Sequence, residues 1–155
     1  MKNFLTILIP GLIVSAILAF IFHFILGLLN FGLPFIVPII EGAIVGVVLL
    51  ILLRFSPHLT ANKFWGLVGI FALTMYVVPQ YLDFMAVSDA INADPELAAE
   101  MGSISFIDYM DLASKLGSDF GRVTSSSSFH LDGIGYWALQ LVEIVLYGFG
   151  IIYGI

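Results

Sequence analysis

Three ionisable side chains, His23, Glu41 and Glu143, and the polar amide of Gln140 stand inside long apolar runs of this sequence. A charged group at the middle of a bilayer costs roughly 2.5 to 3.5 kcal/mol on insertion scales, so each of them requires an explanation. A carboxyl group and an imidazole can bind a cation or exchange protons, and Tyr76 adds a hydroxyl in a further apolar run. If the apolar runs pack together, these five residues form one polar cluster around a hydrated cavity that opens outward.

Two interpretations of this polar cluster stay open. In the first, it binds a cation or relays protons; in the second, its members hydrogen-bond across helices and only stabilise the bundle. A metal site is weakly indicated, because His23 has no Glu or His one turn away on its own helix. The sequence has no cysteine, no G-x-S-x-G, no H-E-x-x-H and no phosphate-binding glycine loop. It therefore predicts no catalytic residue, no bound metal and no cofactor.

The apolar runs are long enough to cross a membrane. Hydrophobic residues make up 61% of the 155 residues and charged residues 10%, with a mean hydropathy of +1.11, which excludes a soluble domain. Since about 20 apolar residues cross the hydrocarbon core, we expect an all-α integral membrane protein with four transmembrane helices in a single domain over residues 1–155. The four expected spans are Phe4–Leu29, Phe35–Leu53, Phe64–Leu82 and Gly133–Ile155.

Local signals refine these spans. The Pro10-Gly11 pair should kink the first helix, Asn62 is a plausible cap of the third, and Pro79 should break the third near its end. We expect the first span to be retained as an anchor, because its apolar run is longer than that of a signal peptide.

Basic residues in the short connections predict the orientation. Lys2, Arg54 and Lys63 place both termini in the cytoplasm and residues 83–132 outside, in a plasma membrane such as a bacterial inner membrane. Residues 83–132 carry nine acidic and two basic residues, and the whole chain has a formal net charge of -6. This balance argues against a nucleic-acid partner, because phosphate binding requires clustered Lys and Arg.

The acidic segment 83–132 is predicted to be an extramembrane insertion of short helices between the third and fourth spans. Asp94 followed by proline is typical of a helix start and Gly102 of a helix end, which predicts a helix over Pro95–Met101. Ser105 and Asp108 have the spacing of a capping box, which predicts a second helix that ends before Gly117.

The second helix of the insertion is amphipathic. Phe106, Met110 and Ala113 fall on one apolar face, which docks either on the bundle or membrane surface or on a partner protein. The serine run Ser125–Ser128 is expected to be a tether before the last span.

Glycines predict close helix packing. Gly42 and Gly46 form G-x-x-x-G beside Glu41, which allows another backbone to approach, either within the bundle or in an oligomer. In the last span, Tyr147 and Tyr153 are interpreted as part of an aromatic belt.

These features favour a polytopic membrane protein without catalytic activity. We expect it to act as a subunit or homo-oligomeric component of a membrane assembly, whose partners are the lipid bilayer and other membrane proteins or copies of itself. The alternative is a small proton- or cation-conducting transporter or channel that uses Glu143, Glu41 and His23 beneath an acidic vestibule. An enzyme inside the membrane has no motif to support it.

Overall fold

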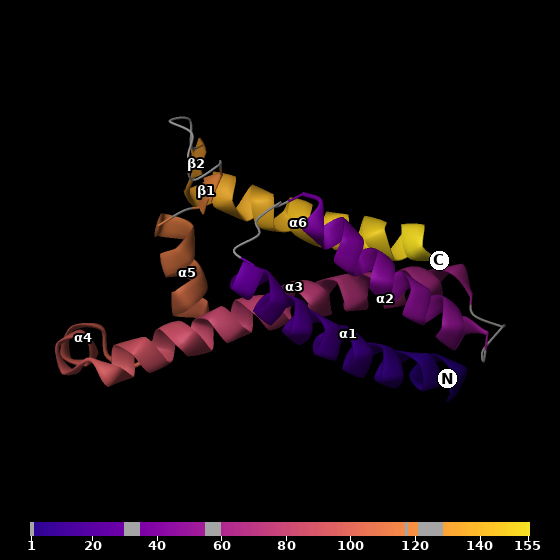
Figure 1. Ribbon diagram of the computed structural model, residues 1–155, viewed down its shortest axis with the longest axis horizontal. Coiled ribbons are helices and arrows are strands. Elements are labelled where there is room, and N and C mark those ends of the chain that lie inside the picture. The colour runs from indigo at the N-terminus through magenta and orange to yellow at the C-terminus, as the bar shows by residue number, and fades with distance from the viewer. Residues whose placement is uncertain (1, 30–34, 55–59, 117, 121–128) are drawn as a thin grey trace. The chain divides into compact units, whose positions relative to one another are not determined.

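The structure is a computed structural model that describes residues 2–29, 35–54, 60–116, 118–120 and 129–155. Within these residues the chain forms six helices and one short hairpin (Figure 1). The serine run Ser125–Ser128 lies outside the described residues. The elements, in chain order, are α1 Lys2–Leu29, α2 Val37–Leu53, α3 Ala61–Ala93, α4 Pro95–Met101, α5 Phe106–Leu116, β1 Ser118–Phe120, β2 Phe129–Leu131 and α6 Gly133–Gly154.

Three of the helices are long and apolar enough to cross a membrane. They are α1, with an apolar stretch over Phe4–Leu26, α3 and α6, so the protein is a helical protein suited to a membrane. The remaining expected span, Phe35–Leu53, corresponds to the apolar helix α2. Its 17 residues reach about 26 Å, slightly less than a hydrocarbon core of about 30 Å. A count of four spans is therefore not confirmed. Helix α1 continues through Pro10.

The bounds predicted for the third span are wrong at both ends. Helix α3 begins at Ala61, and the carbonyl of Thr60 accepts the first backbone hydrogen bonds, so Asn62 lies inside the helix and does not cap it. Pro79 does not end the helix, which runs on to Ala93. The Pro79 ring removes one backbone N–H donor, and the helix continues until Asp94, whose position before a proline disfavours helical dihedrals.

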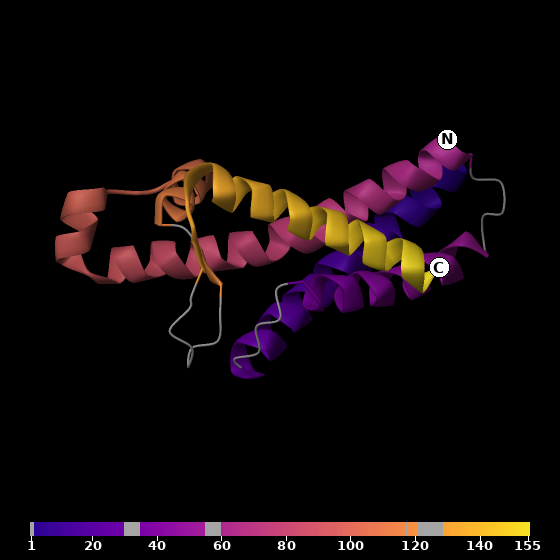
Figure 2. The same cartoon turned by 90° about the horizontal axis from the view of Figure 1, so that it is seen from above.

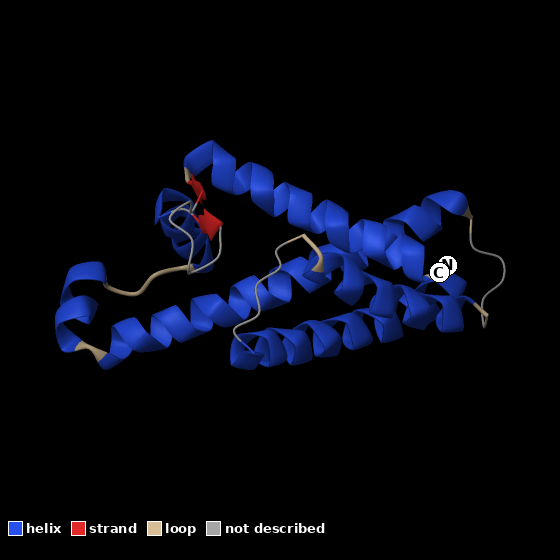
Figure 3. Cartoon of the chain, turned by 45° about the horizontal axis from the view of Figure 1, so that its top comes forward, coloured by secondary structure: helices blue, strands red, loops and turns tan. Residues whose placement is uncertain are grey.

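The chain divides into two compact units, which we describe separately. The first unit comprises residues 1–79 and 142–155, and so contains α1, α2, the beginning of α3 and the end of α6. The second unit comprises residues 80–141, with the rest of α3, helices α4 and α5, the hairpin and the beginning of α6. Figure 3 shows that the hairpin is the one part of the described chain drawn as strands.

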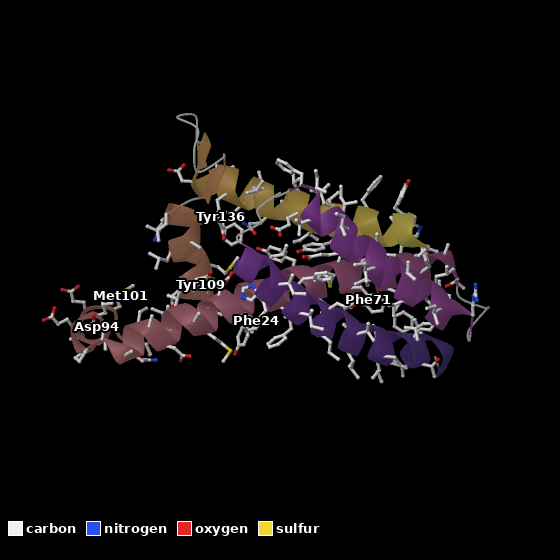
Figure 4. All side chains as sticks on the ribbon, in the orientation of Figure 1. Phe24, Phe71, Asp94, Met101, Tyr109 and Tyr136 are labelled. Atoms are coloured by element: carbon white, nitrogen blue, oxygen red, sulfur yellow. The ribbon has the colours of Figure 1, made fainter. Side chains whose placement is uncertain are left out.

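In the first unit the helices pack through small residues and a buried core. Helix α1 packs on α2, and Gly11 of α1 lies against the ring of Phe71 on α3, which Figure 4 labels. Gly148 of α6 faces Val68 and Ala72 of α3, with side-chain carbons 3.9 Å from where a Cβ would stand. The largest fully buried side chains of this unit come from all four helices and are Ile7, Ser15, Val45, Leu49, Leu67, Phe71, Met75 and Ile151.

In the second unit the predicted insertion helices have the predicted caps. The Asp94 side chain accepts hydrogen bonds from the backbone N–H groups of the first turn of α4, and Gly102 follows its end with a positive φ of 63°. The Ser105 hydroxyl accepts a hydrogen bond from the Asp108 N–H at 3.2 Å, while the Asp108 carboxylate accepts one from the Ser105 N–H at 3.0 Å. This reciprocal pair is the capping box predicted for α5. Strands β1 and β2 pair antiparallel, with Asp119 opposite His130.

Candidate functional site

A seam of glycines brings α2 and α6 into backbone contact in the first unit (Figure 2). A Cβ atom added to Gly42 would lie 3.1 Å from the Cα of Gly150, and one added to Gly46 would lie 3.0 Å from the Cα of Gly154. The G-x-x-x-G pair predicted on α2 therefore faces a second pair with the same spacing on α6 of the same chain. Since the lower-numbered glycines face each other, as do the higher-numbered ones, the two helices run in the same direction.

Two glutamates from the two seam helices meet at one tyrosine. Glu41 of α2 is 3% exposed and stands next to Gly42 at the seam, and Tyr147 of α6 is 4% exposed. Glu41, Glu143 and Tyr147 are close enough to one another to interact electrostatically. We call these three residues the Glu41–Tyr147–Glu143 group.

Local helix geometry explains why these side chains face each other. Glu143 and Tyr147 are four residues apart on α6, so they project from one face of that helix. The backbone of α2 lies directly against this part of α6, because the carbonyl oxygen of Tyr147 itself occupies the space beside Gly42. Glu41 precedes Gly42, is buried, and interacts electrostatically with Glu143 and Tyr147. The described basic side chains of the first unit, Arg54 and Lys63, are exposed near helix ends.

The polar residues singled out from the sequence fall into both units. The first unit contains Glu41, Glu143, His23 and Tyr76. Tyr76 is buried, and His23 is half-buried, with its ring edge-on to that of Phe24 and the two ring centroids 5.7 Å apart. Gln140 belongs to the second unit, is 6% exposed, and accepts a 3.4 Å hydrogen bond from the Gln80 amide.

Sequence reasoning missed Tyr147 as a site residue. It was interpreted as part of an aromatic belt, but the structure buries it, whereas Tyr153 on the same helix is 80% exposed. The available signal was its spacing of four residues from Glu143, which places a hydroxyl beside an intramembrane carboxyl group. That spacing indicates a partner for the carboxyl group more directly than a place at the membrane interface.

The apolar face of α5 packs on α3 within the second unit. The ring centroid of Phe106 lies 5.8 Å from that of Tyr81 and 5.7 Å from that of Phe84. Met110 is 9% exposed and Ala113 is half-buried. The face predicted to dock on the bundle or on a partner therefore contacts its own chain.

A polar group adjoins this aromatic packing. Tyr109 of α5 interacts electrostatically with Asp83 of α3 and Tyr136 of α6, and Figure 4 labels both tyrosines. Burial, followed by the charge of Asp83 and then by Tyr136, raises the pKa of Tyr109 to about 12. The Tyr109 phenol therefore stays protonated over the physiological range and acts in the second unit as a neutral polar group.

Within the described ranges, no three His, Asp or Glu side chains gather as a metal-binding group. Comparison with protein-family models, curated proteins and solved structures gives no match to this chain. The function must therefore be argued from the chemistry of the chain's own residues, and the Glu41–Tyr147–Glu143 group is the most distinctive chemistry that they offer.

Proposed function

We propose that this protein is a small membrane protein that binds and conducts protons or other cations through the Glu41–Tyr147–Glu143 group. The observation that supports this proposal most strongly is that two glutamates from different helices interact electrostatically beside a buried tyrosine, and that one of them, Glu41, is itself buried at the glycine seam. Packing alone does not require such an arrangement, because apolar side chains of similar volume would fill the same space without a desolvation cost.

The electrostatics of the pair require a positive partner. Two ionised carboxylates that interact in an apolar bundle repel each other, and the buried Glu41 carboxylate has also lost its hydration. A basic side chain would relieve this repulsion, but Arg54 and Lys63 are exposed near helix ends. The half-buried imidazole of His23 is a further basic group of this unit, and the other sources of positive charge are a proton or a cation from solution. A site that must take up one of these, between helices suited to a membrane, has the basic property of a transporter or channel.

The proposal includes a topology in which α2 also crosses the membrane. Both termini then lie in the cytoplasm and residues 83–132 lie outside, as the positions of Lys2, Arg54 and Lys63 predict. The nine acidic residues of that segment would concentrate cations on the outer side. The chain has no cysteine, so a single cysteine can be placed at Glu100 or at Ile155 to test this topology. A thiol reagent that does not cross the membrane should label the cysteine at position 100 only from outside and the one at position 155 only from the cytoplasmic side.

The test of conduction is flux in proteoliposomes that contain the purified protein and a pH-sensitive or cation-sensitive dye. Glu143→Gln and Glu41→Gln should each abolish most of the flux, because a neutral amide cannot take up the transported charge. Glu100→Gln is the matched control, since this glutamate is exposed on α4 and its loss should leave the flux unchanged. Absence of any proton or cation flux in the unmodified protein would refute the proposal.

A second candidate function is that of a component of a membrane assembly. The observation that favours it is on α4, where no residue is buried and Leu97 and Met101, one turn apart, are 41% and 42% exposed. The face first predicted for a partner contacts its own chain, so α4 is the better candidate. The test is the particle mass of the protein in mild detergent, with and without Leu97→Asp. A particle larger than one chain that Leu97→Asp dissociates would support this function. A larger particle that persists in Leu97→Asp would exclude α4 as its interface.

A further inference from the structure

Helix α4 has an apolar face that the described part of the chain leaves uncovered. Leu97 and Met101 lie one turn apart on this helix, and they are 41% and 42% exposed; Figure 4 labels Met101. No residue of α4 is buried. The helix is nevertheless well capped, since the Asp94 carboxylate accepts hydrogen bonds from the N–H groups of Glu96 at 2.9 Å and Leu97 at 3.3 Å. The sequence thus forms a defined helix whose apolar side chains stay on the surface.

The position of α4 at the end of α3 keeps this face away from lipid. Helix α3 continues over residues 83–93, past the apolar run that ends at Leu82. At 1.5 Å per residue this extension is about 16 Å long. The polar headgroup layer on one side of a bilayer is only about 5 to 8 Å thick. In the proposed topology α4 therefore lies beyond the headgroups, and lipid chains do not cover Leu97 and Met101.

The charge around α4 indicates the kind of partner that fits this face. Residues 83–116 hold seven acidic residues and one basic residue, Lys115, which is already paired with Asp111 at 2.6 Å. Asp94 and Glu96 are exposed and precede Leu97 in the chain. An interface between α4 of two copies of this chain would bring like charges together, and in the proposed topology the other described basic residues lie on the cytoplasmic side. Lys or Arg side chains of a different protein would instead be attracted.

We infer that α4 docks a basic amphipathic helix of a partner protein outside the membrane. The apolar side chains of that helix cover Leu97 and Met101, and its Lys or Arg side chains face the acidic residues around them. Amphipathic helices commonly bind through such an apolar row, and the flexible side chain of methionine adapts to the shape of its partner. This inference rests on the second candidate function, that of a component of a membrane assembly, and names the class of partner.

The test uses the full chain in phosphatidylcholine nanodiscs and a synthetic helical peptide of leucine and lysine, with all its leucines on one face. The chain has no cysteine, so Ser103→Cys can carry an environment-sensitive dye at an exposed position next to α4. The same dye on Ile155→Cys is the control for binding of the peptide to lipid. We expect the peptide to change the emission at position 103 and not at position 155. A counterpart peptide with glutamate in place of every lysine should bind at least about 10-fold more weakly, and raised salt should reduce this difference.

Substitutions in α4 test whether this face is the docking surface. Leu97→Asp and Met101→Gln remove the apolar row, and the fold should tolerate both because no residue of α4 is buried. Each should raise the dissociation constant of the lysine peptide about 10-fold or more, the size of effect expected of an anchoring residue in an interface. Ile107→Asp is the matched control, because it places the same charge at a 79% exposed apolar residue of α5 and should leave the dissociation constant unchanged.

The outcomes separate the inference from the assembly function on which it rests. Equal binding of the two peptides, or binding that survives Leu97→Asp and Met101→Gln, would overturn the inference. A particle of two or more copies of this chain alone that Leu97→Asp dissociates would show that α4 binds a second copy, which overturns the inference and leaves the assembly function standing. If neither peptide binds and the protein from its native membrane is a single chain, both are overturned.

Discussion

Replacing Gly46 by alanine should destabilise the protein, and the structure gives the size of the effect. The added Cβ would lie 3.0 Å from the Cα of Gly154 and closer still to the carbonyl oxygen of Ile151. Non-bonded heavy atoms in optimal contact are about 3.5 Å or more apart, and the oxygen contact is the tighter one, so α2 must move away by roughly 1 Å. A gap of that size forfeits roughly a quarter to a half of the attraction between the facing atoms.

We therefore expect Gly46→Ala to lower the free energy of unfolding by about 1 to 3 kcal/mol, the usual range for an overpacked site. The assay is unfolding in mixed detergent and SDS micelles, followed by circular dichroism. Gly69→Ala is the matched control, because no other part of the described protein beyond its own local helix backbone lies within 4 Å of its added Cβ, and alanine favours a helix over glycine by up to about 1 kcal/mol. Equal stability of the two variants would refute the description of the seam as a hard backbone contact.

Three further predictions concern the second unit. Phe84→Ala removes the ring contacts of Phe84 with Phe106 and Tyr109 of α5 and with Tyr81 of α3. It should weaken the packing of α5 on α3 by about 2 kcal/mol, and the measurement is amide hydrogen exchange, which should become faster in α5 alone. Hydrogen bonds from Ser105 hold the pKa of Asp108 below its ordinary 3.8, so the capping box stabilises α5 above that pH and is lost as the pH falls through the lowered value. In Ser105→Ala an NMR titration should show the Asp108 pKa returning toward 3.8. Ultraviolet absorbance should show Tyr109 titrating near pH 12, and a midpoint at 10 would contradict its burial beside Asp83.

The sequence predicted the helices wherever local chemistry sets them. Helix α4 has the predicted bounds, Pro95–Met101, because its N-cap aspartate, its first-turn proline and its terminal glycine act within a few residues of one another. The bounds of the apolar helices also follow closely from hydropathy, except in α3. There Pro79 carries a local stop signal, and the helix of 33 residues nevertheless continues through it to Ala93.

What the sequence by itself determined was the helical, membrane-suited character of the chain and the residues too polar for their surroundings, because both depend on composition and short-range spacing. Only the tertiary structure decided which of those residues meet. Glu41 lies more than one hundred residues before Tyr147, and they come together because two glycine pairs, each unremarkable alone, let α2 and α6 touch backbone to backbone. Such pairing depends on the shapes of both helix surfaces at once, which no local pattern contains.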